Sequence, residues 1–399
     1  MKEFGHEVDL TTVCDTITYG YTASATDEDT GVKFLRITDI VPDRINWETV
    51  PFCLINEKDV EKYQLNIGDI VVARTGATTG WNKTIKHLNH KAVYASFLIK
   101  YSVDRSIADP NYVGYNLQSS NWYDYVEAIA GGSAQPGANA KQLGSFKFLL
   151  PSLSEQKAIA SVLSSLDDKI DLLHRQNKTL EAMAETLFRQ WFIEEAKEDW
   201  EEKTIGDIFT IKGGGTPSTK EPSYWDGSIA WTSPRDLSTA KSLYMFSTER
   251  TITELGLTKV SSGLLPVGTL LMSSRAPIGY LALTDIEVAV NQGYIAILKH
   301  DLYSNEFMYL WCKANMELIK NSGNGSVFQE ISKASFRELP FVCPPEPLLK
   351  RFNGYCINWF SKIKLNAKQI QTLENLRDTL LPRLMSGEVR VQYQTEDVA

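Results

Sequence analysis

The sequence predicts an α+β protein with a pseudo-two-fold internal repeat: two heads of mixed α/β structure, separated by two long helices that pair antiparallel as a coiled coil. Three observations lead to this fold class. One stretch of the chain is repeated, its apolar residues follow a heptad pattern, and the remaining segments alternate like short strands. At 399 residues the chain is long enough for two or three domains. The expected boundaries are 1–150 for head one, 151–199 for the first long helix, 200–344 for head two, and 345–399 for the second long helix with a short tail.

The repeat is clearest between residues 169–187 and residues 362–380. When the first stretch is shifted by 193 positions, nine of its nineteen residues meet an identical residue without a gap. The matching residues of the first copy are Lys169, Ile170, Leu172, Gln176, Thr179, Leu180, Glu181, Thr186 and Leu187. Agreement of this extent indicates a duplicated unit, so the two halves of the chain are expected to share one fold.

Apolar residues recur at heptad spacing within residues 155–198, and neither proline nor glycine interrupts this range. At about 1.5 Å per residue, such a helix reaches roughly 60 Å. A lone helix of this length would expose its apolar stripe to water, so it needs a partner, and the second copy is the obvious one. The residues expected on the seam are Ile159, Leu163, Leu166, Ile170, Leu173, Asn177, Leu180, Leu187, Phe352, Trp359, Ile363, Asn366, Ile370, Leu373 and Leu380. Asn177 and Asn366 are either tolerated polar residues or a pair that fixes the register.

Head one contains short segments typical of β-strands. Residues 31–39, 69–74 and 92–100 alternate apolar and polar side chains, and turn residues separate them. Each of these segments is therefore predicted to form one strand.

Head two repeats the plan of head one at scattered anchor points. Residues 74–80 correspond to residues 275–279, which pairs Arg74 with Arg275, and residues 145–147 correspond to residues 335–337. Between these anchors the heads diverge widely, whereas the long helices remain alike. A shared scaffold that carries two different heads accounts for this pattern.

The composition limits where the chain works and what it binds. The formal net charge is −8, and no part of the chain is a basic tail. Binding to DNA would therefore need basic residues that cluster in space or positive charge from a partner. The cysteines are scattered without a CxxC pair, which suits a reducing, cytoplasmic location. The first ten residues have no apolar core, and no run of about eighteen apolar residues exists, so neither a secretory signal nor a membrane span is expected.

Several possible enzyme signals are incomplete. Residues 109–112 read Asp-Pro-Asn-Tyr, which resembles the Asp-Pro-Pro-Tyr of adenine methyltransferases, but the second proline is missing and no glycine-rich cofactor loop accompanies it. A turn at the start of a helix is the favoured interpretation. His87 and His90 have no cluster of further ligands around them in the sequence, so a surface loop is expected rather than a metal site. No catalytic residue and no metal ligand is predicted.

A set of motifs along the chain resembles one family. Head two contains Gly214-Gly-Thr-Pro-Ser218, Tyr224-Trp-Asp-Gly227 and Ser274-Arg-Ala-Pro-Ile-Gly279. The first long helix opens with Ser154-Glu-Gln156, and the second closes with the run Leu376-Arg-Asp-Thr-Leu-Leu-Pro-Arg-Leu-Met-Ser-Gly-Glu-Val389. Together these motifs resemble the specificity subunit of type I restriction–modification enzymes. The chain departs from the pattern in two places: Leu348 and Leu349 replace the Glu-Gln opening of the second helix, and head one has no GGTPS stretch.

The resemblance implies a non-catalytic subunit that recognises double-stranded DNA. Each head would be a target-recognition domain for one half of a split site, and the two helices would set the gap between the halves. Two modification subunits would dock on the chain and supply S-adenosylmethionine and adenine methylation. Restriction subunits would join them to translocate and cut DNA. The chain itself would need no cofactor, and its partners would supply the missing positive charge.

Polar residues at predicted strand ends and in glycine-bounded loops are the candidate DNA contacts. Arginine can pair with guanine through two hydrogen bonds, asparagine and glutamine can do so with adenine, and small hydroxyls or lysine suit phosphate. The candidates in head one are Arg36, Thr38, Arg74, Thr75, Thr78, Thr79, Trp81, Asn82 and Lys83. Those in head two are Lys212, Thr216, Ser218, Thr232, Ser233, Arg235, Ser273, Ser274, Arg275, Asn291 and Gln292. Ordinary polar turns are the alternative for each of them, and Trp231 suits the core as well as it suits a contact.

Two other functions remain open from the sequence. A coiled-coil scaffold whose heads bind proteins would agree with the acidic net charge. An autonomous methyltransferase would need a motif that the chain does not complete.

Overall fold

The computed structural model describes residues 4–42, 44–131, 137–275, 277–323 and 329–392, so the expected tail after 392 lies outside the described residues. The chain divides into two compact units. Unit one combines Met1–Ile170 with Thr372–Ala399, and unit two is Asp171–Gln371. Each unit therefore holds one head together with part of both long helices. In this division both long helices are shared between the two units.

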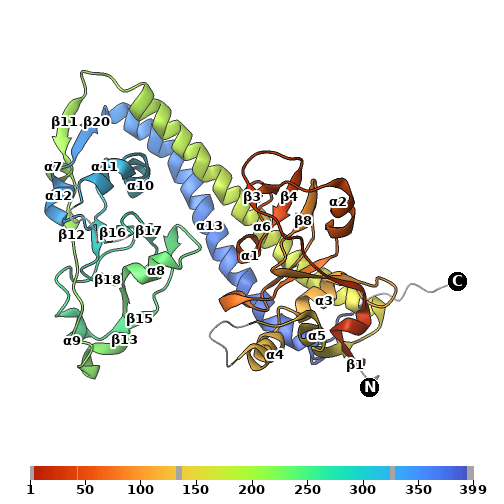
Figure 1. Cartoon of the computed structure of the whole chain (residues 1–399). Helices are drawn as coiled ribbons and strands as arrows, with labels where there is room; N and C mark the ends of the chain where they lie inside the picture. Colours follow the sequence, from red (N-terminus) through yellow and green to blue (C-terminus); the bar gives the residue numbers. More distant parts are fainter. Residues whose placement is uncertain (1–3, 43, 132–136, 276, 324–328, 393–399) are drawn as a thin grey trace. The chain divides into compact units, whose positions relative to one another are not determined.

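Unit one contains head one (Figure 1). Its strands are β1 (His6–Asp9), β2 (Cys14–Tyr19), β3 (Ala25–Thr26), β4 (Val32–Leu35), β5 (Phe52–Cys53), β6 (Ile70–Ala73), β7 (Asn82–Thr84), β8 (Lys91–Tyr94), β9 (Leu98–Val103) and β10 (Lys147–Leu150). Its short helices are η1 (Leu10–Val13), α1 (Ile37–Ile40), α2 (Glu57–Tyr63), η2 (Gly76–Thr78), α3 (Pro110–Asn116), α4 (Ser120–Ala130) and α5 (Ala140–Gly144). The strands form three sheets in the orders β2-β9-β6-β7, β3-β5-β4-β8 and β1-β10.

Unit two contains head two. Its strands are β11 (Glu201–Thr204), β12 (Ile211–Lys212), β13 (Trp225–Thr232), β14 (Tyr244–Met245), β15 (Arg250–Ile252), β16 (Leu270–Ser273), β17 (Leu281–Thr284), β18 (Ala289–Val290), β19 (Tyr294–Ile297) and β20 (Pro340–Cys343). Its short helices are α7 (Ile205–Ile208), η4 (Pro222–Tyr224), α8 (Pro234–Ser238), α9 (Glu254–Leu257), α10 (Asn305–Ala314), α11 (Met316–Asn321) and α12 (Lys333–Arg337). The sheet orders are β12-β19-β16-β17-β14, β15-β13-β18 and β11-β20.

The two heads share one strand plan, as the internal repeat predicted. The four strands β2-β9-β6-β7 correspond to β12-β19-β16-β17, and the antiparallel pair β1-β10 corresponds to β11-β20. In each head a parallel pair of strands is also present, β4 with β8 and β13 with β18. These matches define which residues of the heads are structurally equivalent.

One correspondence expected from the sequence is wrong. Residues 145–147 do not match residues 335–337, because Leu10 N donates to Phe146 O whereas the equivalent Ile205 N donates to Leu339 O. Phe146 and Leu339 are 193 positions apart, the same offset as between the long helices. The Ser-Phe pair at 335–336 is a coincidence three residues away, where Phe336 fills the core beneath α12.

The segment 92–100 is two strands rather than the single strand expected. β8 pairs parallel with β4, whereas β9 pairs antiparallel with β6 in a different sheet. The chain changes sheets at the turn 95–97, where Ala95 N donates to Leu35 O and Ser96 N donates to Tyr21 O. Likewise, the expected strand 31–39 ends at Leu35, after which α1 begins.

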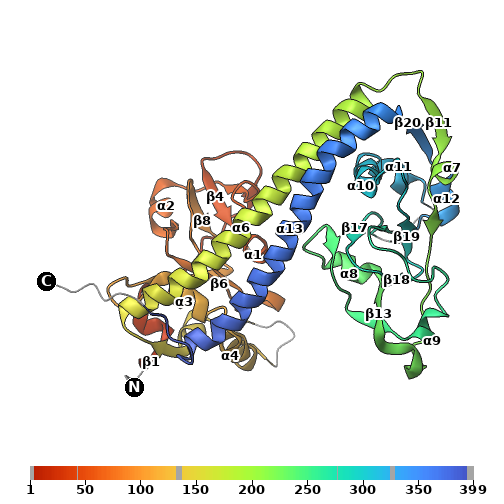
Figure 2. The same cartoon turned by 180° about the vertical axis from the view of Figure 1, so that it is seen from behind.

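The long helices are α6 (Leu153–Arg189), continued by one π-helical turn η3 (Gln190–Glu194), and α13 (Glu346–Met385). They begin at equivalent positions, 193 residues apart. Within each unit they run side by side and antiparallel (Figures 1 and 2). In unit one Arg377 Nη1 lies 3.2 Å from Asp167 Oδ1, and in unit two Asn366 Nδ2 donates to Asn177 Oδ1 at 2.9 Å.

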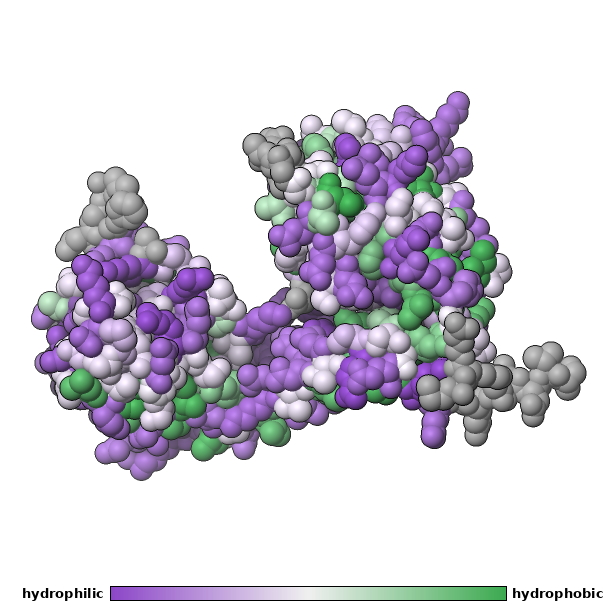
Figure 3. All heavy atoms as spheres, turned by 90° about the horizontal axis from the view of Figure 1, so that it is seen from below, coloured by the Kyte–Doolittle hydropathy of each residue, from purple (hydrophilic) through white to green (hydrophobic). Residues whose placement is uncertain are grey.

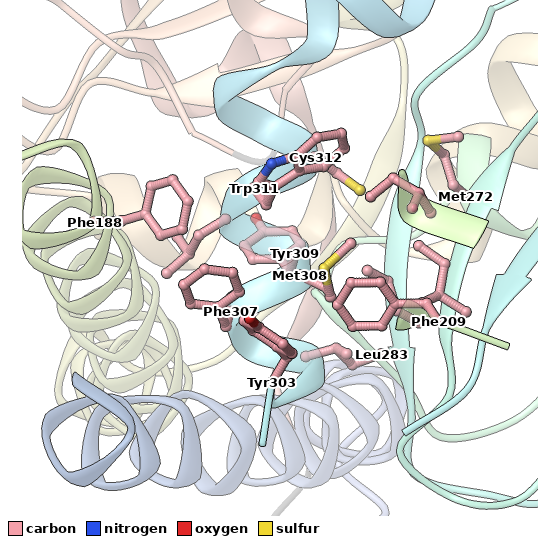
Figure 4. Packing of buried hydrophobic residues seen from close by; sticks show 14 of the residues in the cluster. Phe188, Phe209, Met272, Leu283, Tyr303, Phe307, Met308, Tyr309, Trp311 and Cys312 are labelled. Carbon is pink, nitrogen blue, oxygen red and sulfur yellow. The ribbon is translucent and has the colours of Figure 1, made fainter. Parts of the chain in front are cut away.

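All residues expected on the seam are buried or half-buried in the structure. The sequence did not predict that the same helices also pack against the core of each head. Phe188 of α6 is 5.1 Å from Phe307 of α10 and 6.0 Å from Phe352 of α13, measured between ring centres. Figure 4 shows Phe188 and Phe307 in this aromatic cluster, together with Tyr303 and Phe209. Each head is thus fixed to its helices by a continuous apolar core.

Polar contacts also join the heads to the helices. In unit one Gln156 of α6 is buried, accepts a hydrogen bond from Asp109 N and donates to Pro151 O, both at 2.9 Å. In unit two the buried Leu349 occupies the equivalent position, so the missing Glu-Gln opening is replaced by apolar packing. On the face drawn in Figure 3, hydrophilic residues cover much of each head. Small groups of hydrophobic residues are scattered among these hydrophilic residues. Within the described ranges, no helix has both the length and the apolar character needed to cross a bilayer.

Candidate nucleic-acid interface

In head one, the segments that follow four strands meet at one edge. Tyr21 N donates to Tyr94 O at 2.8 Å, which joins the end of β2 to the end of β8. Ala95 N donates to Leu35 O at 2.9 Å, which joins β8 to β4, and Arg74 N donates to Phe97 O at 3.1 Å, which joins β6 to the same turn. We call residues 19–22, 36–39, 74–81 and 95–97 recognition edge one. It carries most of the candidate residues of head one.

Head two builds the same edge with the same backbone hydrogen bonds. Gly215 N donates to Val290 O, Asn291 N donates to Thr232 O, and Ser274 N donates to Gly293 O, at 2.9–3.0 Å. We call residues 213–218, 233–236, 274–275, 277–280 and 291–293 recognition edge two. The two edges are therefore equivalent in backbone and differ in side chains.

The glycines at the start of each edge have a packing role. A Cβ on Gly214 would lie 1.5 Å from Val290 O, and a Cβ on Gly20 would lie 2.2 Å from Ala95 O. Since no real Cβ approaches a backbone oxygen so closely, both positions require glycine. Gly20 is thus the equivalent of Gly214. Head one therefore has a structural equivalent of the GGTPS stretch, although the two stretches differ in sequence.

The expected pairing of Arg74 with Arg275 is wrong by one residue. Ala138 N donates to Arg74 O, and the equivalent bond runs from Ile331 N to Ser274 O. The sequence match was anchored on Gly80 and Gly279, but the loop that precedes Gly80 is one residue longer. Because successive side chains of extended backbone point to opposite sides, this offset matters: Arg74 and Arg275 do not occupy the same place.

Arg74 is held in one orientation at the centre of recognition edge one. Its Nε donates to Ser96 O at 3.0 Å, and its guanidinium carbon lies 5.2 Å from the ring centre of Tyr19. A cation over an aromatic face is attracted by about 0.5–1 kcal/mol at exposed sites. The side chain is half-buried, and the hydrogen bond at Nε fixes its position.

Of the other three edge arginines named as candidates, Arg36 and Arg275 are paired with carboxylates. Arg36 donates from Nε and Nη2 to Asp39 at 3.0 Å, and this hydrogen bonding raises the pKa of Arg36 above its ordinary value. Arg275 Nε donates to Glu330 Oε1 at 3.1 Å at an exposed position. The Arg275 pair is exposed at both side chains and is therefore weak, whereas the Asp39 side chain of the Arg36 pair is only 10% exposed.

Some candidates of head one face the interior. Thr79 and Asn82 are buried, and the Asn82 amide donates to the carbonyls of Gly80 and Leu117. They support the turn rather than present a free group at the edge. The remaining candidates of head one are half-buried or exposed: Arg36, Thr38, Arg74, Thr75, Thr78, Trp81 and Lys83.

Head two shows the same division. Thr232, Ser273 and Ser274 are buried, and Thr232 Oγ1 shares hydrogen bonds with Tyr294 and Asp236. Trp231 is buried as well and donates from Nε1 to Gly215 O, so it belongs to the core. The remaining candidates of head two are half-buried or exposed: Lys212, Thr216, Ser218, Ser233, Arg235, Arg275, Asn291 and Gln292.

Two amide side chains stand at the tip of recognition edge two. Gln292 Oε1 accepts a hydrogen bond from Thr216 Oγ1 at 2.7 Å, and Asn291 Oδ1 accepts one from Gly293 N at 2.8 Å. Each carbonyl is thereby fixed in place and retains a second lone pair. The equivalent residues of head one are Ala95 and Ser96, which carry no amide.

Sequence reasoning missed two aromatic residues of recognition edge one. Tyr19 is 43 % exposed and Phe97 is 54 % exposed, large fractions for rings at the centre of an edge. Phe97 was assigned to the interior of a single strand, and only the break between β8 and β9 places it in a turn. Tyr19 lies at the end of β2 just before Gly20, and this Tyr-Gly step is the only signal that the sequence offered.

The incomplete enzyme signals have structural explanations. Asp109 is the N-cap of α3, where its Oδ1 accepts hydrogen bonds from the backbone N–H groups of Asn111 and Tyr112 at 3.0 Å. Pro110 follows as the first residue of the helix, a position that proline favours. The helix-entry interpretation is therefore confirmed. His87 and His90 are both exposed.

Comparison with known proteins identifies the family. The family model described as "Type I restriction modification DNA specificity domain" matches residues 9–182 and again residues 197–375. The chain belongs to this family. Its two matches coincide with the two repeats, each made of one head and the long helix that follows it.

Curated relatives and a solved structure agree with this assignment. A type I restriction enzyme MjaIX specificity subunit of Methanocaldococcus jannaschii is 37% identical over 166 residues, which cover 41% of this chain and 38% of that protein. A putative MjaX specificity subunit of the same organism is 23% identical over 418 residues, 96% of this chain and 93% of that protein. The crystal structure of a type I system S subunit from M. genitalium shares the fold of this specificity subunit, with a TM-score of 0.61 at 17% identity, over 98% of this chain and 96% of that one.

Proposed function

We propose that this specificity subunit binds a split site in double-stranded DNA, with recognition edge one on one half-site and recognition edge two on the other. The observation that carries the proposal is the combination of an equivalent backbone with different exposed side chains. Arg74, Tyr19 and Phe97 mark the first edge, whereas Asn291 and Gln292 mark the second. Because the two edges share one backbone, each can approach a duplex in the same way. Because their side chains differ, the two half-sites that they recognise should differ in base sequence.

The two long helices then set the gap between the half-sites. They pair antiparallel, begin at equivalent positions, and carry an apolar seam with a polar pair at Asn177 and Asn366. An asparagine on such a seam fixes register, which a device that measures distance requires. A helix pair is stiff, so its length is a suitable standard against the rise of a duplex.

Catalysis belongs to partner subunits in this proposal. Two modification subunits dock on the chain and supply S-adenosylmethionine and methyl transfer to adenine, and restriction subunits join them in the cytoplasm. The net charge of −8 supports this division of work, because an acidic chain alone binds DNA weakly. The positive charge that grips the phosphates would come mainly from the partners.

Gel-shift measurements on the assembled complex test the proposal. The chain is expressed with its modification subunits, methylated adenines are sequenced in cells, and the motif found is used as the binding probe. We expect tight binding to that split motif and binding at least about 1000-fold weaker to a scrambled probe. Absence of specific binding with partners and methyl donor present would reject the proposal.

A scaffold whose heads bind proteins is the second candidate, and the acidic charge favours it. The same experiment separates the two. A scaffold would assemble with partners yet leave no split methylation motif, and alanine at Arg74 or Gln292 would leave the methylome unchanged.

A further inference from the structure

Arg74 is a half-buried cation of recognition edge one that is held by two contacts. Ser96 O binds its Nε, and the Tyr19 ring lies against its guanidinium. Tyr19 is itself fixed, because its hydroxyl accepts a hydrogen bond from Ala140 N at 3.0 Å. Among the described residues, no acceptor is bonded to the two terminal amino groups of Arg74. The guanidinium is therefore oriented before any ligand arrives, which lowers the entropy lost on binding.

The free edge of Arg74 selects among base pairs. An arginine can approach a pair of acceptors either with Nε and one terminal nitrogen or with both terminal nitrogens. Because Ser96 already binds Nε, only the second approach remains. Guanine offers two neighbouring acceptors in the major groove, O6 and N7, whereas adenine offers one acceptor beside an amino donor. The two terminal amino groups of Arg74 can therefore donate to both acceptors of guanine, whereas on adenine one of them would face the amino donor.

Phe97 lies in the same turn as Ser96. Its backbone carbonyl accepts the hydrogen bond from Arg74 N, and its side chain is 54 % exposed. A phenyl group so exposed gains by apolar contact, and in the major groove it meets thymine methyl groups and base edges. A phosphate partner for Arg74 would leave the ring without such a contact, so the two residues together favour base recognition.

Head two lacks this arrangement although its backbone is equivalent. Gly213, Ser274 and Gly293 stand where head one has Tyr19, Arg74 and Phe97. Ser274 is buried, and the two glycines present no side chain. Recognition edge one thus carries all three side chains, and recognition edge two, with an equivalent backbone, carries none of them.

We propose that Tyr19, Arg74 and Phe97 form a single base-recognition unit, in which the two terminal amino groups of Arg74 read a guanine in the half-site of head one and Phe97 contacts the neighbouring base pair. This rests on the proposed function, since it presumes that head one meets DNA at recognition edge one. Tyr19 is a positioning residue that aligns the arginine. Head two reads no guanine from the equivalent place.

The first test leaves the protein unaltered. The assembled complex with its modification subunits binds probes in which each guanine of the head-one half-site is replaced, one at a time, by 7-deazaguanine. This base keeps its Watson–Crick pairing but lacks the N7 acceptor. We expect one position to weaken binding by about tenfold to hundredfold. Tolerance of every replacement, or a head-one half-site without guanine, would overturn the proposal.

Variants then assign the contact to its residue. Arg74→Ala should remove the discrimination at that single position and leave the other half-site intact. Phe97→Ala should weaken binding to the same half-site by a smaller factor. Tyr19→Ala should reduce the discrimination at that position, and Tyr19→Phe, which keeps the ring but loses the hydrogen bond from Ala140 N, should reduce it less. Arg105→Ala is the matched control, since Arg105 lies at the opposite end of β6, where it donates to Ile67 O. It should leave the half-site unchanged.

The possible outcomes separate the two proposals. If the wild-type complex binds no split site, the proposed function fails. If it binds one but Arg74→Ala weakens all sequences equally and reduces the salt dependence, Arg74 grips phosphate and this inference fails. If a variant does not fold, the 7-deazaguanine series on the wild-type complex still decides the question.

Discussion

At the scale of the residue, single glycines determine where the recognition edges can form. Gly20 and Gly214 let the chain cross directly over a neighbouring strand end, where Ala95 O and Val290 O leave no room for a Cβ. The crossing brings the segments after four strands into one line. The glycine is thus required by the packing of the edge itself.

Gly214→Ala should therefore destabilise unit two. The new Cβ would meet a backbone oxygen, and overpacking of this kind costs about 1–3 kcal/mol. Gly354→Ala is the control: Gly354 is exposed inside α13, nothing lies within 4 Å of the place that an added methyl group would take, and the change should stabilise the helix by about 0.5–1 kcal/mol. Urea unfolding followed by circular dichroism measures both. Equal effects of the two substitutions would contradict the packing argument.

The residue scale is also where sequence reasoning failed most. Composition at strand ends marked Arg74, Thr232 and Asn82 alike as candidates. The interior positions of Thr232 and Asn82 follow from side-chain direction, which alternates along a strand and cannot be fixed without the register. The one-residue error at Arg275 has the same origin. The hydrophobic pattern could not identify exposed rings such as Phe97, because an apolar residue within a strand-like segment is normally predicted to be buried.

At the scale of the element, the long helices were the most predictable part of the chain. Their heptad rows are sustained and uninterrupted, so both existence and pairing followed from the sequence. The additional buried row at Phe188 and Phe192 did not follow. A helix that packs against both a partner helix and a head has a wider apolar stripe. Periodicity alone does not show which apolar residues contact the partner helix and which contact the head.

The polar pair on the seam has the properties of a register device. Asn366 is fully buried and donates to Asn177 at 2.9 Å, while Asn177 Nδ2 lies 3.5 Å from Ile363 O. Burial of an amide without a partner costs about 1–3 kcal/mol. A slipped pairing would separate the two asparagines and incur that cost, so the aligned register is favoured over its neighbours.

Asp285 joins head two to α13 and should make unit two sensitive to acid. Lys364 Nζ lies 3.1 Å and Lys368 Nζ lies 2.6 Å from its carboxylate. Partial burial raises the pKa of Asp285, but the hydrogen bonds from Lys368 and Lys364 outweigh it and hold the pKa below its ordinary value. A lowered carboxylate pKa stabilises the folded form at neutral pH, and this contribution disappears as the pH falls below about 4.

Asp285→Asn should accordingly lower the free energy of unfolding at pH 7 by about 1 kcal/mol, because the lysines are partly exposed and solvent weakens the pair. The difference should shrink as the pH falls below about 4, because Asp285 becomes protonated as the pH approaches its lowered pKa. Glu346→Gln serves as the control, since Glu346 pairs with Lys350 at an exposed position in α13. Urea unfolding at a series of pH values from 7 down to 3 measures the difference, and a gap that does not shrink over this range would contradict the assignment.

At the scale of the whole molecule, duplication separates what is constant from what varies. The two long helices begin 193 residues apart and share nine of nineteen residues in their central stretch, whereas the recognition edges share only their backbone. Such a chain can change one edge without disturbing the other, because each head has its own core and its own contacts with the helices. New half-sites can therefore be combined on an unchanged spacer.

The spacer itself gives the most direct prediction about the proposed function. Asn177 faces Asn366 across the seam, so seven residues inserted after Arg175 and seven after Ala367 enter at facing positions and keep every heptad in phase. The helices lengthen by about 10 Å, which corresponds to about three base pairs of duplex. Sequencing of methylated adenines should then show the same two half-sites with a gap about three base pairs wider.

Two controls make that result specific. Insertion into α6 alone should abolish methylation, because the facing asparagines and the apolar rows of one unit fall out of register. Insertion of five residues into both helices should fail as well, since at about 3.6 residues per turn it turns the apolar stripe about 140° away from the partner helix. An unchanged gap after the paired seven-residue insertion would mean that the helices hold the heads without measuring their separation, and the distance between half-sites would then have to come from the partner subunits.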